Sequence, residues 1–334
     1  MFVSVVIPTF QRSQLLRRML EALLAQSADP SSFEVLVCDS HSTDGTDAMV
    51  EEVQRAHASL SLRHLHAIGN VLSEKRNLGL REAAGEVVVF LDDDCVPARN
   101  LVQRYRDLLA TAPPRVVFCG EVQFPSEWVA QSNYVRFRDE RHFRFAGPDA
   151  PQPRDLDFRT IVVMNMGLRK AEVLGEVGGF DERFIGYGLE DQEFGWRLQR
   201  AGFRIAPCDA RITHFETSVT LSAYCGKINR AARDGGRMLL ELSPDAARSL
   251  RTFGLEPTAP PSLKWSAIRA LLRSPLPALV EKFLALVDRK RSLYFPTLYR
   301  VVMARAALDG IEARPKAPLA KEHVRKGWYD DGGS

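Results

Sequence analysis

The sequence predicts an α/β protein with a doubly wound, mostly parallel sheet, helices on both faces of that sheet, and a C-terminal helical extension. In the first hundred residues, short and almost continuous apolar runs alternate with longer segments whose leucines recur at helical spacing. After about residue 221 only helical periodicity continues, interrupted by prolines. We therefore expect an α/β domain over residues 1–220, a helical region over 221–313 and a loose tail over 314–334.

The individual elements follow from the same two patterns. Apolar runs typical of strands buried on both faces occupy residues 3–7, 33–38, 62–65, 87–91, 116–120, 160–168 and 203–213. Helical spacing occupies residues 12–25, 44–58, 73–84, 101–110, 190–201, 223–241, 263–272, 278–288 and 299–307. Thr43 or Asp44 is the expected cap of the second helix. Residues 121–160 show no clear period, which is typical of a functional or mobile loop.

Composition and charge limit the classes of partner. The chain has 334 residues and a formal charge of +3, which is too small to indicate a nucleic-acid partner. The charge is uneven, because residues 263–334 carry 14 Lys or Arg against 7 Asp or Glu. A basic C-terminal region of this kind indicates either a phosphate-bearing partner or an ordinary solvated helical face.

The cysteines and the N-terminus bear on the compartment. There are five cysteines and no Cys-x-x-Cys spacing, which argues against a disulfide framework or a zinc site. The N-terminus reads as a strand and lacks the features of a signal peptide, and no apolar run reaches the roughly 20 residues of a membrane span. The expected location is the cytoplasm, with the inner face of a membrane left open.

Three consecutive acids, Asp92, Asp93 and Asp94, follow the apolar run 87–91. Three carboxylates at one strand end repel one another unless a divalent cation or bound hydroxyl groups offset their charge. Oxygen ligands suit Mg²⁺ or Mn²⁺, which bridges the oxygens of a diphosphate. The sequence therefore predicts a metal-assisted diphosphate site, with a solvated acidic turn as the alternative.

Two further acids, Glu190 and Asp191, open a predicted helix after a glycine-rich turn. The helix N-terminus favours negative charge, so a carboxylate there stays ionised near neutral pH and accepts a proton from a bound hydroxyl. This pair is the expected catalytic site.

Other residues extend the candidate site. Arg76 and Asn77 open a helix and suit phosphate groups, although a charged helix face has the same pattern. Asp39 ends a strand and suits a base N–H or a ribose hydroxyl. His214 follows the last strand and is either a metal ligand or a structural histidine. Residues 136–144 alternate arginines with aromatics, which fits an acceptor surface or a mobile loop.

Taken together, residues 2–216 resemble the inverting family 2 glycosyltransferases, which have a nucleotide-sugar-binding domain of the GT-A type. The segment Pro8-Thr9-Phe10-Gln11-Arg12 is similar to the family's base-binding turn, which often has Asn where this chain has Gln11. Asp39 falls where the family contacts uracil, and Arg76-Asn77-Leu78-Gly79 resembles its second nucleotide segment. The glycine-rich residues 178–188 are similar to the branch of chondroitin-polymerase and galactosyltransferase-like domains.

The resemblance implies roles for the acids. Asp92, Asp93 and Asp94 correspond to the donor-binding acidic motif, with Asp94 as metal ligand and His214 as its partner. Asp191 is implied as the catalytic base, with Glu190 as a contact to sugar or acceptor. His41, which interrupts the family's usual turn after Asp39, leaves the base preference open.

The implied activity is transfer of a sugar from a nucleoside-diphosphate sugar, most simply a UDP-sugar, to an acceptor hydroxyl with Mn²⁺ or Mg²⁺. The acceptor class stays open among carbohydrates, lipid-linked sugars and small molecules. The alternatives are a non-catalytic scaffold subunit of the same fold and a sugar nucleotidyltransferase. For the C-terminal helices, docking on the catalytic domain, homodimerisation and contact with an anionic membrane all remain open.

Overall fold

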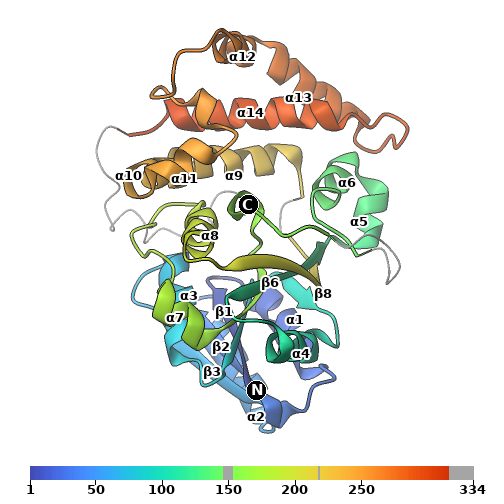
Figure 1. Cartoon of the computed structure of the whole chain (residues 1–334). Coiled ribbons are helices and arrows are strands. Elements are labelled where there is room, and N and C mark those ends of the chain that lie inside the picture. The colour runs from blue at the N-terminus through green and yellow to red at the C-terminus, as the bar shows by residue number, and fades with distance from the viewer. Residues whose placement is uncertain (146–152, 217–218, 316–334) are drawn as a thin grey trace.

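The structure, a computed structural model, describes residues 1–145, 153–216 and 219–315. One curved sheet forms the lower part of the molecule and a stack of helices forms the upper part (Figure 1). The sheet has eight strands in the order β3-β2-β1-β4-β7-β6-β8-β5. The strands are β1 (Val3–Thr9), β2 (Phe33–Asp39), β3 (Ser61–His66), β4 (Val87–Leu91), β5 (Cys95–Pro97), β6 (Val116–Gln123), β7 (Asn165–Arg169) and β8 (Arg204–His214).

The sheet confirms the α/β prediction and adds antiparallel strands to it. β3, β2, β1 and β4 run parallel, and β6 runs parallel to β8. β7 lies antiparallel between β4 and β6, and the short β5 pairs antiparallel with β8. The sheet is therefore mixed. The apolar runs predict that these segments are strands, but they carry no signal for the direction in which each strand runs.

Helices cover both faces of the sheet, as predicted. Those of the α/β part are α1 (Ser13–Leu24), α2 (Thr46–Ala56), α3 (Leu72–Glu82), α4 (Leu101–Thr111), α5 (Ser126–Gln131), α6 (Asn133–Asp139), α7 (Lys170–Glu176) and α8 (Glu190–Arg200). α1, α2 and α4 contribute to one hydrophobic cluster, and α3, α7 and α8 to the other.

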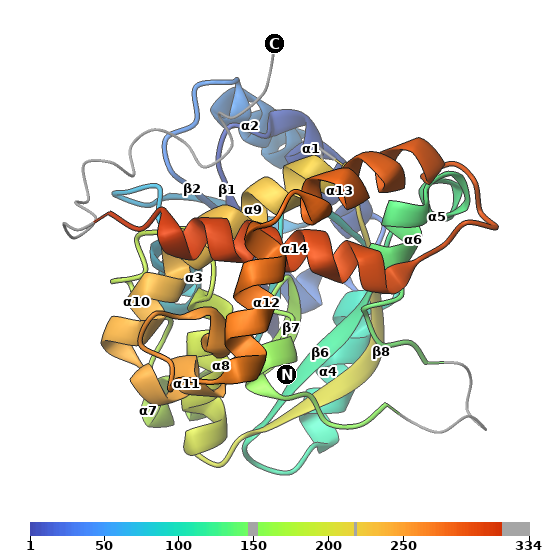
Figure 2. The same cartoon turned by 90° about the horizontal axis from the view of Figure 1, so that it is seen from above.

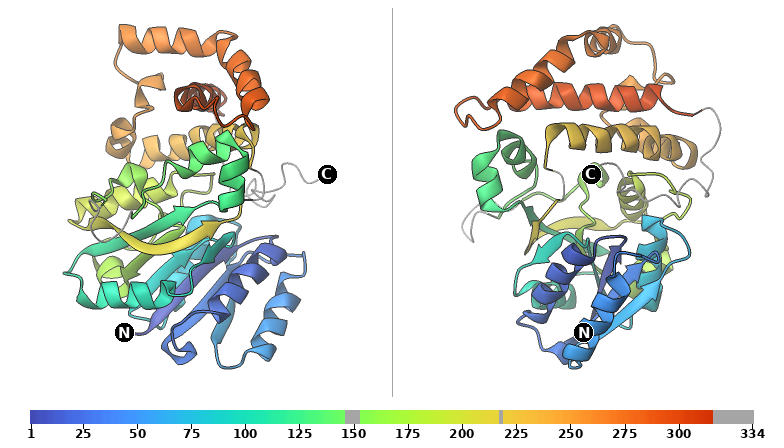
Figure 3. Two further views of the ribbon diagram at one scale, coloured as in Figure 1. Left: turned by 90° about the vertical axis from the view of Figure 1, so that its right-hand side faces the viewer. Right: turned by 180° about the vertical axis from the view of Figure 1, so that it is seen from behind.

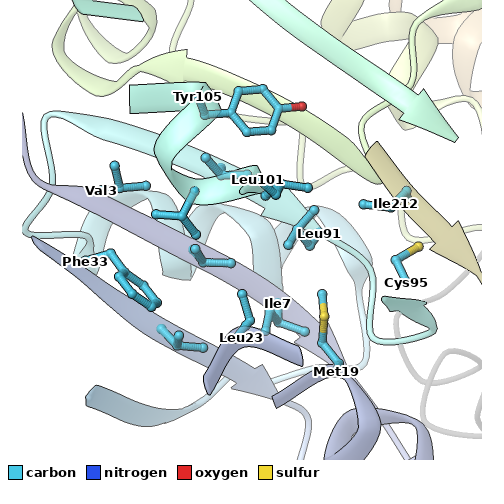
Figure 4. Packing of buried hydrophobic residues seen from close by; sticks show 14 of the residues in the cluster. Val3, Ile7, Met19, Leu23, Phe33, Leu91, Cys95, Leu101, Tyr105 and Ile212 are labelled. Atoms are coloured by element: carbon cyan, nitrogen blue, oxygen red, sulfur yellow. The ribbon is translucent and has the colours of Figure 1, made fainter. Parts of the chain in front are cut away.

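The β1 strand shows why both faces must be covered. All seven of its residues are buried. Val3 and Ile7 point to the side of α1 and α4, where they meet Met19, Leu23 and Leu101 (Figure 4). Val6 belongs to the opposite cluster. A strand buried in this way must be apolar at successive positions, which is the pattern that the sequence shows.

Several local predictions need correction. Residues 121–160 contain α5 and α6, two helices too short to give a readable period. The predicted helix 223–241 is two helices separated at Asp234. The second helix begins at Thr46 behind Gly45, whose φ is +87°, and Asp44 accepts hydrogen bonds from Ser13 N and Thr46 Oγ1. Thr43 therefore does not cap this helix, and Asp44 ties together the starts of α1 and α2.

The helical region forms a cap above the sheet, with α14 crossing α9 and with α12 and α13 outermost (Figures 2 and 3). Its helices are α9 (Leu221–Arg233), α10 (Gly235–Leu242), α11 (Pro244–Ser249), α12 (Leu263–Arg273), α13 (Leu276–Val287) and α14 (Pro296–Glu312). Among the residues described, no helix is both long enough and apolar enough to cross a membrane. The predicted loose tail lies mostly outside the described residues, which end at 315.

The cap contacts the sheet through α6, which lies in the region 121–160 for which the sequence predicts no regular element. Arg138 of α6 donates to Glu216, just beyond β8, and its guanidinium lies 3.8 Å from the ring centre of Tyr224 on α9. Phe137 stacks on Tyr299 of α14 at 4.8 Å. Phe137 and Arg138 of this segment of alternating arginines and aromatics therefore form part of a packed joint between sheet and cap.

A buried asparagine closes a defect in the middle of the sheet. The pairing of β6 with β8 shifts register between Gly120 and Glu121. The Asn165 amide nitrogen donates 3.0 Å hydrogen bonds to the carbonyl oxygens of Glu121 and Ala210, and its Oδ1 accepts from Tyr105 at 2.8 Å. Asn165 thus supplies the bonds that the interrupted ladder cannot.

We predict that Asn165→Ala destabilises the protein by about 2–4 kcal/mol, because two buried carbonyls lose their donor. Urea unfolding followed by circular dichroism measures the change. Asn100→Ala is the matched control, since Asn100 is exposed and makes no side-chain cap. Equal stability of both variants would show that the carbonyl groups of Glu121 and Ala210 find other hydrogen-bond donors when Asn165 is removed.

Candidate active site

The predicted site residues converge at the carboxyl ends of the strands. Asp39 ends β2, Asp92 to Asp94 follow β4, and His214 ends β8. α8 begins at Glu190, as predicted, and brings Glu190 and Asp191 to the same edge. This edge is where a sheet of this kind binds its ligands.

Arg76 gathers the acids on one side of the site. Its Nη1 lies 2.6 Å from Asp191 Oδ1 and 3.4 Å from Glu190 Oε1, and its Nη2 lies 3.2 Å from Asp92 Oδ1. The Arg76 residue is only 2% exposed. Burial disfavours its charge, but the surrounding carboxylates outweigh burial and raise the pKa of Arg76 above its usual range. A permanent cation thus stands at the centre of three acids.

The two acids of α8 differ in protonation. Burial and the neighbouring charge of Asp191 raise the pKa of Glu190 to about 7, against the opposing effect of Arg76. Burial also raises the pKa of Asp191, whereas Arg76 lowers it. Because Asp191 has the shorter contact with the guanidinium, it is the acid that ionises first, and Glu190 exchanges its proton near neutral pH.

The turn before α8 is clamped by the helical cap. Gly188 and Leu189 both have left-handed backbones, with φ of +82° and +68°. A Cβ added to Gly235 of α10 would lie 1.9 Å from the carbonyl oxygen of Gly188. The absence of a side chain at Gly235 therefore lets α10 rest directly on the turn that positions the two acids.

The other side of the site is built around Asp94. Arg12 Nη1 donates 2.9 Å bonds to both Asp93 Oδ1 and Asp94 Oδ2, and Thr9 donates to Asp93 Oδ2. Burial and the charge of Asp94 raise the pKa of Asp93 to about 6, against the opposing effect of Arg12. For Asp94, burial works upward, but His214 and Arg12 hold the pKa well below its usual value. Asp94 is therefore the ionised member of the pair.

The second carboxylate oxygen of Asp94, Oδ1, faces a histidine and a cysteine. His214 Nε2 lies 3.4 Å and Cys95 Sγ 3.6 Å from Asp94 Oδ1. One ligand atom from each residue falls within 4.8 Å of the others, and the buried Nδ1 of His214 has no hydrogen-bond partner among the described residues. Burial and the nearby carboxylates raise the pKa of Cys95 well above that of an ordinary thiol, which disfavours a thiolate ligand. The set suits a cation that prefers oxygen and nitrogen.

Asp39 lies in a separate group at the sheet edge. Its Oδ2 accepts from Ser42 N and its Oδ1 from Ser42 Oγ. The ring of His41 stacks on that of His66 at 4.9 Å, and His64 Nε2 lies 3.9 Å from Asp39 Oδ2. Burial and the neighbouring His66 lower the pKa of His64. The histidine that departs from the family's usual turn thus belongs to a cluster beside Asp39.

Of the remaining candidates, some lie at the end of β1, and Asn77 holds a neighbouring segment in place. Pro8 and Thr9 are the last residues of β1. The centre of the Phe10 ring lies 5.8 Å from Lys75 Nζ, which also donates a hydrogen bond to Thr9 O. Asn77 is a brace, because it donates to Phe180 O and accepts from Phe180 N. The Phe180 ring supports the Arg76 guanidinium at 5.3 Å. Asn77 therefore acts on the acids through Phe180 and Arg76.

A pocket of about 350 Å³ opens beside the acids, lined by Arg76, Asp92, Tyr187, Glu190, Asp191 and Lys227 among others. Lys227 and Tyr224 come from α9, so the cap supplies one wall of the pocket. Lys227 also pairs with Glu216. The sequence contains no signal for this role, because Lys227 is one cation on an amphipathic helix. A larger cavity of about 720 Å³ lies within the cap, between α9 and α14 and away from these acids.

The fold and this arrangement of acids define a glycosyltransferase with a GT-A type domain. The family described as glycosyl transferase family 2 matches residues 4–171, half of the chain. The family described as the N-terminal domain of galactosyltransferase matches residues 154–219. The chain belongs to glycosyl transferase family 2.

Individual relatives agree with this assignment. The chain is 31% identical over 222 residues to validoxylamine A glucosyltransferase of Streptomyces hygroscopicus subsp. limoneus, a match that covers 60% of this chain and 48% of that protein. It is 28% identical over 264 residues to chondroitin synthase of Pasteurella multocida, covering 71% of this chain and 26% of that one. The chain thus matches about half or less of these relatives' length.

Solved structures share the fold over almost the whole chain. The mannosyltransferase PcManGT of Pyrobaculum calidifontis, in complex with GDP-Man and Mn²⁺, has a TM-score of 0.57 at 19% identity, over 93% of this chain and 88% of that one. S. aureus TarS, in complex with UDP-GlcNAc, has a TM-score of 0.50 at 17% identity, over 93% and 91%. The likeness to both extends into the helical cap.

We predict that Arg76→Met moves the acid limb of the activity profile to higher pH. Removing the cation raises the pKa of Asp191 and Glu190, so a base in this pair ionises later as pH increases. kcat/KM measured between about pH 5 and pH 9 reports the shift, and Arg76→Lys restores part of it. Arg81→Met is the control, because Arg81 is exposed and pairs with Glu182. The same fractional loss at every pH would contradict this role for Arg76.

We also predict that Gly235→Ala lowers kcat by at least about tenfold and also lowers the melting temperature, because the added carbon meets backbone atoms that must shift. The new Cβ pushes on Gly188, and a small displacement of the acids is costly for catalysis. Gly175→Ala is the matched control, a glycine of α7 with nothing within 4 Å of the added carbon. Parallel loss of kcat in both variants would show that the contact with the Gly188 turn has no special role.

Proposed function

We propose that the protein is an inverting glycosyltransferase that moves a sugar from a nucleoside-diphosphate sugar to an acceptor hydroxyl, with Asp191 as the base. The observation that carries the proposal is the 2.6 Å pairing of Asp191 with Arg76 at the wall of the pocket. Burial raises the pKa of this carboxylate, and the Arg76 cation opposes that rise and so favours the ionised form that a base needs. Asp191 accepts the acceptor's proton while the acceptor oxygen attacks the anomeric carbon from the face opposite the leaving diphosphate.

Glu190 has a different part in this proposal. With its pKa near 7 it carries a proton for much of the time at neutral pH and donates a hydrogen bond to a sugar or acceptor oxygen. Two adjacent carboxyl groups are thus separated into a base and a donor by their distances from one guanidinium.

A divalent cation fits the chemistry of the Asp94 and His214 side chains. The site offers the ionised Asp94 Oδ1 and, 3.4 Å from it, His214 Nε2, and the neighbouring cysteine is held as a thiol. Mn²⁺ or Mg²⁺ bound there supplies positive charge to the departing diphosphate. Independently, Lys227 and Arg12 bring fixed positive charge to the same side of the site and bind or orient phosphate oxygens.

For the donor we propose a UDP-sugar. Asp39 ends β2 beside Pro8 and Thr9, the last residues of the neighbouring strand β1, and Phe10 follows directly after them. The ring N–H of a base would donate to the Asp39 carboxylate, whose oxygens also accept from Ser42. UDP-GlcNAc in TarS supports a UDP donor on this fold. The acceptor class is a carbohydrate, a lipid-linked sugar or a small molecule with a free hydroxyl.

We predict that Asp191→Asn lowers kcat by about 10²- to 10⁴-fold, because the base is lost while its shape is kept. The same variant still binds UDP with Mn²⁺, seen as a rise in melting temperature. Asp94→Ala, in contrast, loses the metal-dependent rise in melting temperature. Transfer is measured with UDP-Glc, UDP-GlcNAc and UDP-GalNAc against a panel of acceptors.

The control is Asp181→Asn, an acid nine residues before Glu190 that pairs with Arg183 at the surface of the same loop. Wild-type turnover in Asp191→Asn would overturn the assignment of the base. Metal-dependent binding of UDP without transfer or donor hydrolysis in the wild type would favour the scaffold alternative.

A further inference from the structure

The outer helix of the cap exposes a continuous apolar stripe. Leu276, Leu279, Phe283 and Leu286 of α13 are 45%, 60%, 41% and 74% exposed. Their spacing of three, four and three residues places them along one side of the helix. The adjoining side is packed, since Leu284 and Val287 are 1% and 3% exposed. The apolar surface of α13 is therefore wider than the contact it makes with the rest of the cap.

The loop after α13 extends this surface. Phe295 is 39% exposed and its ring lies 5.8 Å from that of Phe283. Leu293 is 36% exposed. We call the six residues the α13 stripe: Leu276, Leu279, Phe283, Leu286, Leu293 and Phe295. Apolar groups gathered in this way, outside a core, mark an interaction surface.

The stripe is held in place by the joint between cap and sheet. Asn133 Nδ2 donates to the carbonyl oxygens of Val287, Lys290 and Leu293 at 3.1, 2.9 and 3.3 Å. Tyr134 N donates to Asp288 Oδ1 at 2.8 Å. The end of α13 and its loop are thus fastened to α6. The exposure of the stripe is a property of the fixed structure and does not come from fraying of the helix.

Exposed cations border the stripe. Lys282 lies between Leu279 and Leu286 on the helix surface, and Arg289 and Lys290 follow the last turn; all three are exposed. None of the three has an acidic partner within the described part of the chain. Residues 263–315 carry 10 Lys or Arg against 4 Asp or Glu. The surface is apolar along its centre and cationic beside it.

We propose that the α13 stripe binds an anionic lipid surface, with α13 lying in the plane of the interface. Leucine and phenylalanine side chains enter the boundary of the acyl region while Lys282, Arg289 and Lys290 contact lipid phosphates. A second copy of this chain fits the surface less well, because a twofold contact places the same uncompensated cations opposite one another. α12 and α13 form the outermost layer on the side away from the sheet, so this contact leaves the sheet uncovered (Figures 1 and 3).

Flotation of the full chain with vesicles tests the proposal. Vesicles of phosphatidylcholine with about 30% phosphatidylglycerol are compared with phosphatidylcholine alone, at low and high salt. We expect the protein to float with the anionic vesicles only and to be released by salt. Leu279→Glu with Leu286→Glu weakens partitioning at least about tenfold, since each leucine withdrawn from water contributes more than the free energy of a tenfold change.

Two further variants separate the contributions. Lys282→Gln with Arg289→Gln and Lys290→Gln is expected to lose the preference for anionic vesicles. Ile68→Glu is the matched control, because Ile68 is 97% exposed on the loop between β3 and α3, far along the chain from the stripe, and this variant floats like the wild type. Thermal unfolding by circular dichroism checks that every variant is folded, which is expected because the altered side chains are exposed.

Three results would overturn the proposal. The first is failure of the wild type to float with anionic vesicles at low salt. The second is unchanged flotation of the folded Leu279→Glu, Leu286→Glu variant. The third is a dimer in light scattering that this variant converts to monomer without any flotation of the wild type, which would assign the stripe to a second copy of the chain.

Discussion

The buried guanidinium of Arg76 is the interaction on which the site depends. It joins α3 to the strand end at Asp92 and to the helix start at Glu190 and Asp191, three segments that are distant in sequence. Without this cation, three carboxylates would lie together in a region that is largely closed to water. Its own position depends on Phe180, which Asn77 fixes through the backbone. Arg76 therefore both compensates the negative charge of the three carboxylates and fixes their positions.

The helical cap completes what the sheet begins. The sheet supplies Asp39, the acids after β4 and His214, but the pocket beside Asp191 needs Lys227 and Tyr224 of α9 for a wall. The joint at α6, where Arg138 contacts Glu216 and Tyr224, keeps this wall aligned with the end of β8. The cap is thus part of the site, although its sequence carries no recognisable catalytic motif.

The layered α/β fold and the acids at the strand ends can be predicted from the sequence, because both depend on local patterns. Apolar runs identify buried strands, and acids directly after them must lie at the strand ends. The antiparallel direction of β7 and the helices α5 and α6 were not accessible, since they depend on contacts such as those of Asn165 and Arg138 with residues far along the chain. Lys227 was missed for the same reason. The place of Asn77 in a predicted helix start and the family resemblance both assign it to the nucleotide, whereas in the structure its side chain bonds to Phe180 and Glu182.

The close approach of Gly235 to Gly188 has a consequence for how such proteins can be recombined. The carbonyl group of Gly188, in the turn before α8, and the backbone of α10 meet with no room for a side chain at Gly235. A chimera that takes the cap from one family member and residues 180–191 from another would bring together two surfaces with unmatched profiles. In a chimera of this protein the turn before α8 and the cap therefore have to be exchanged together, and a suitable junction lies before residue 180.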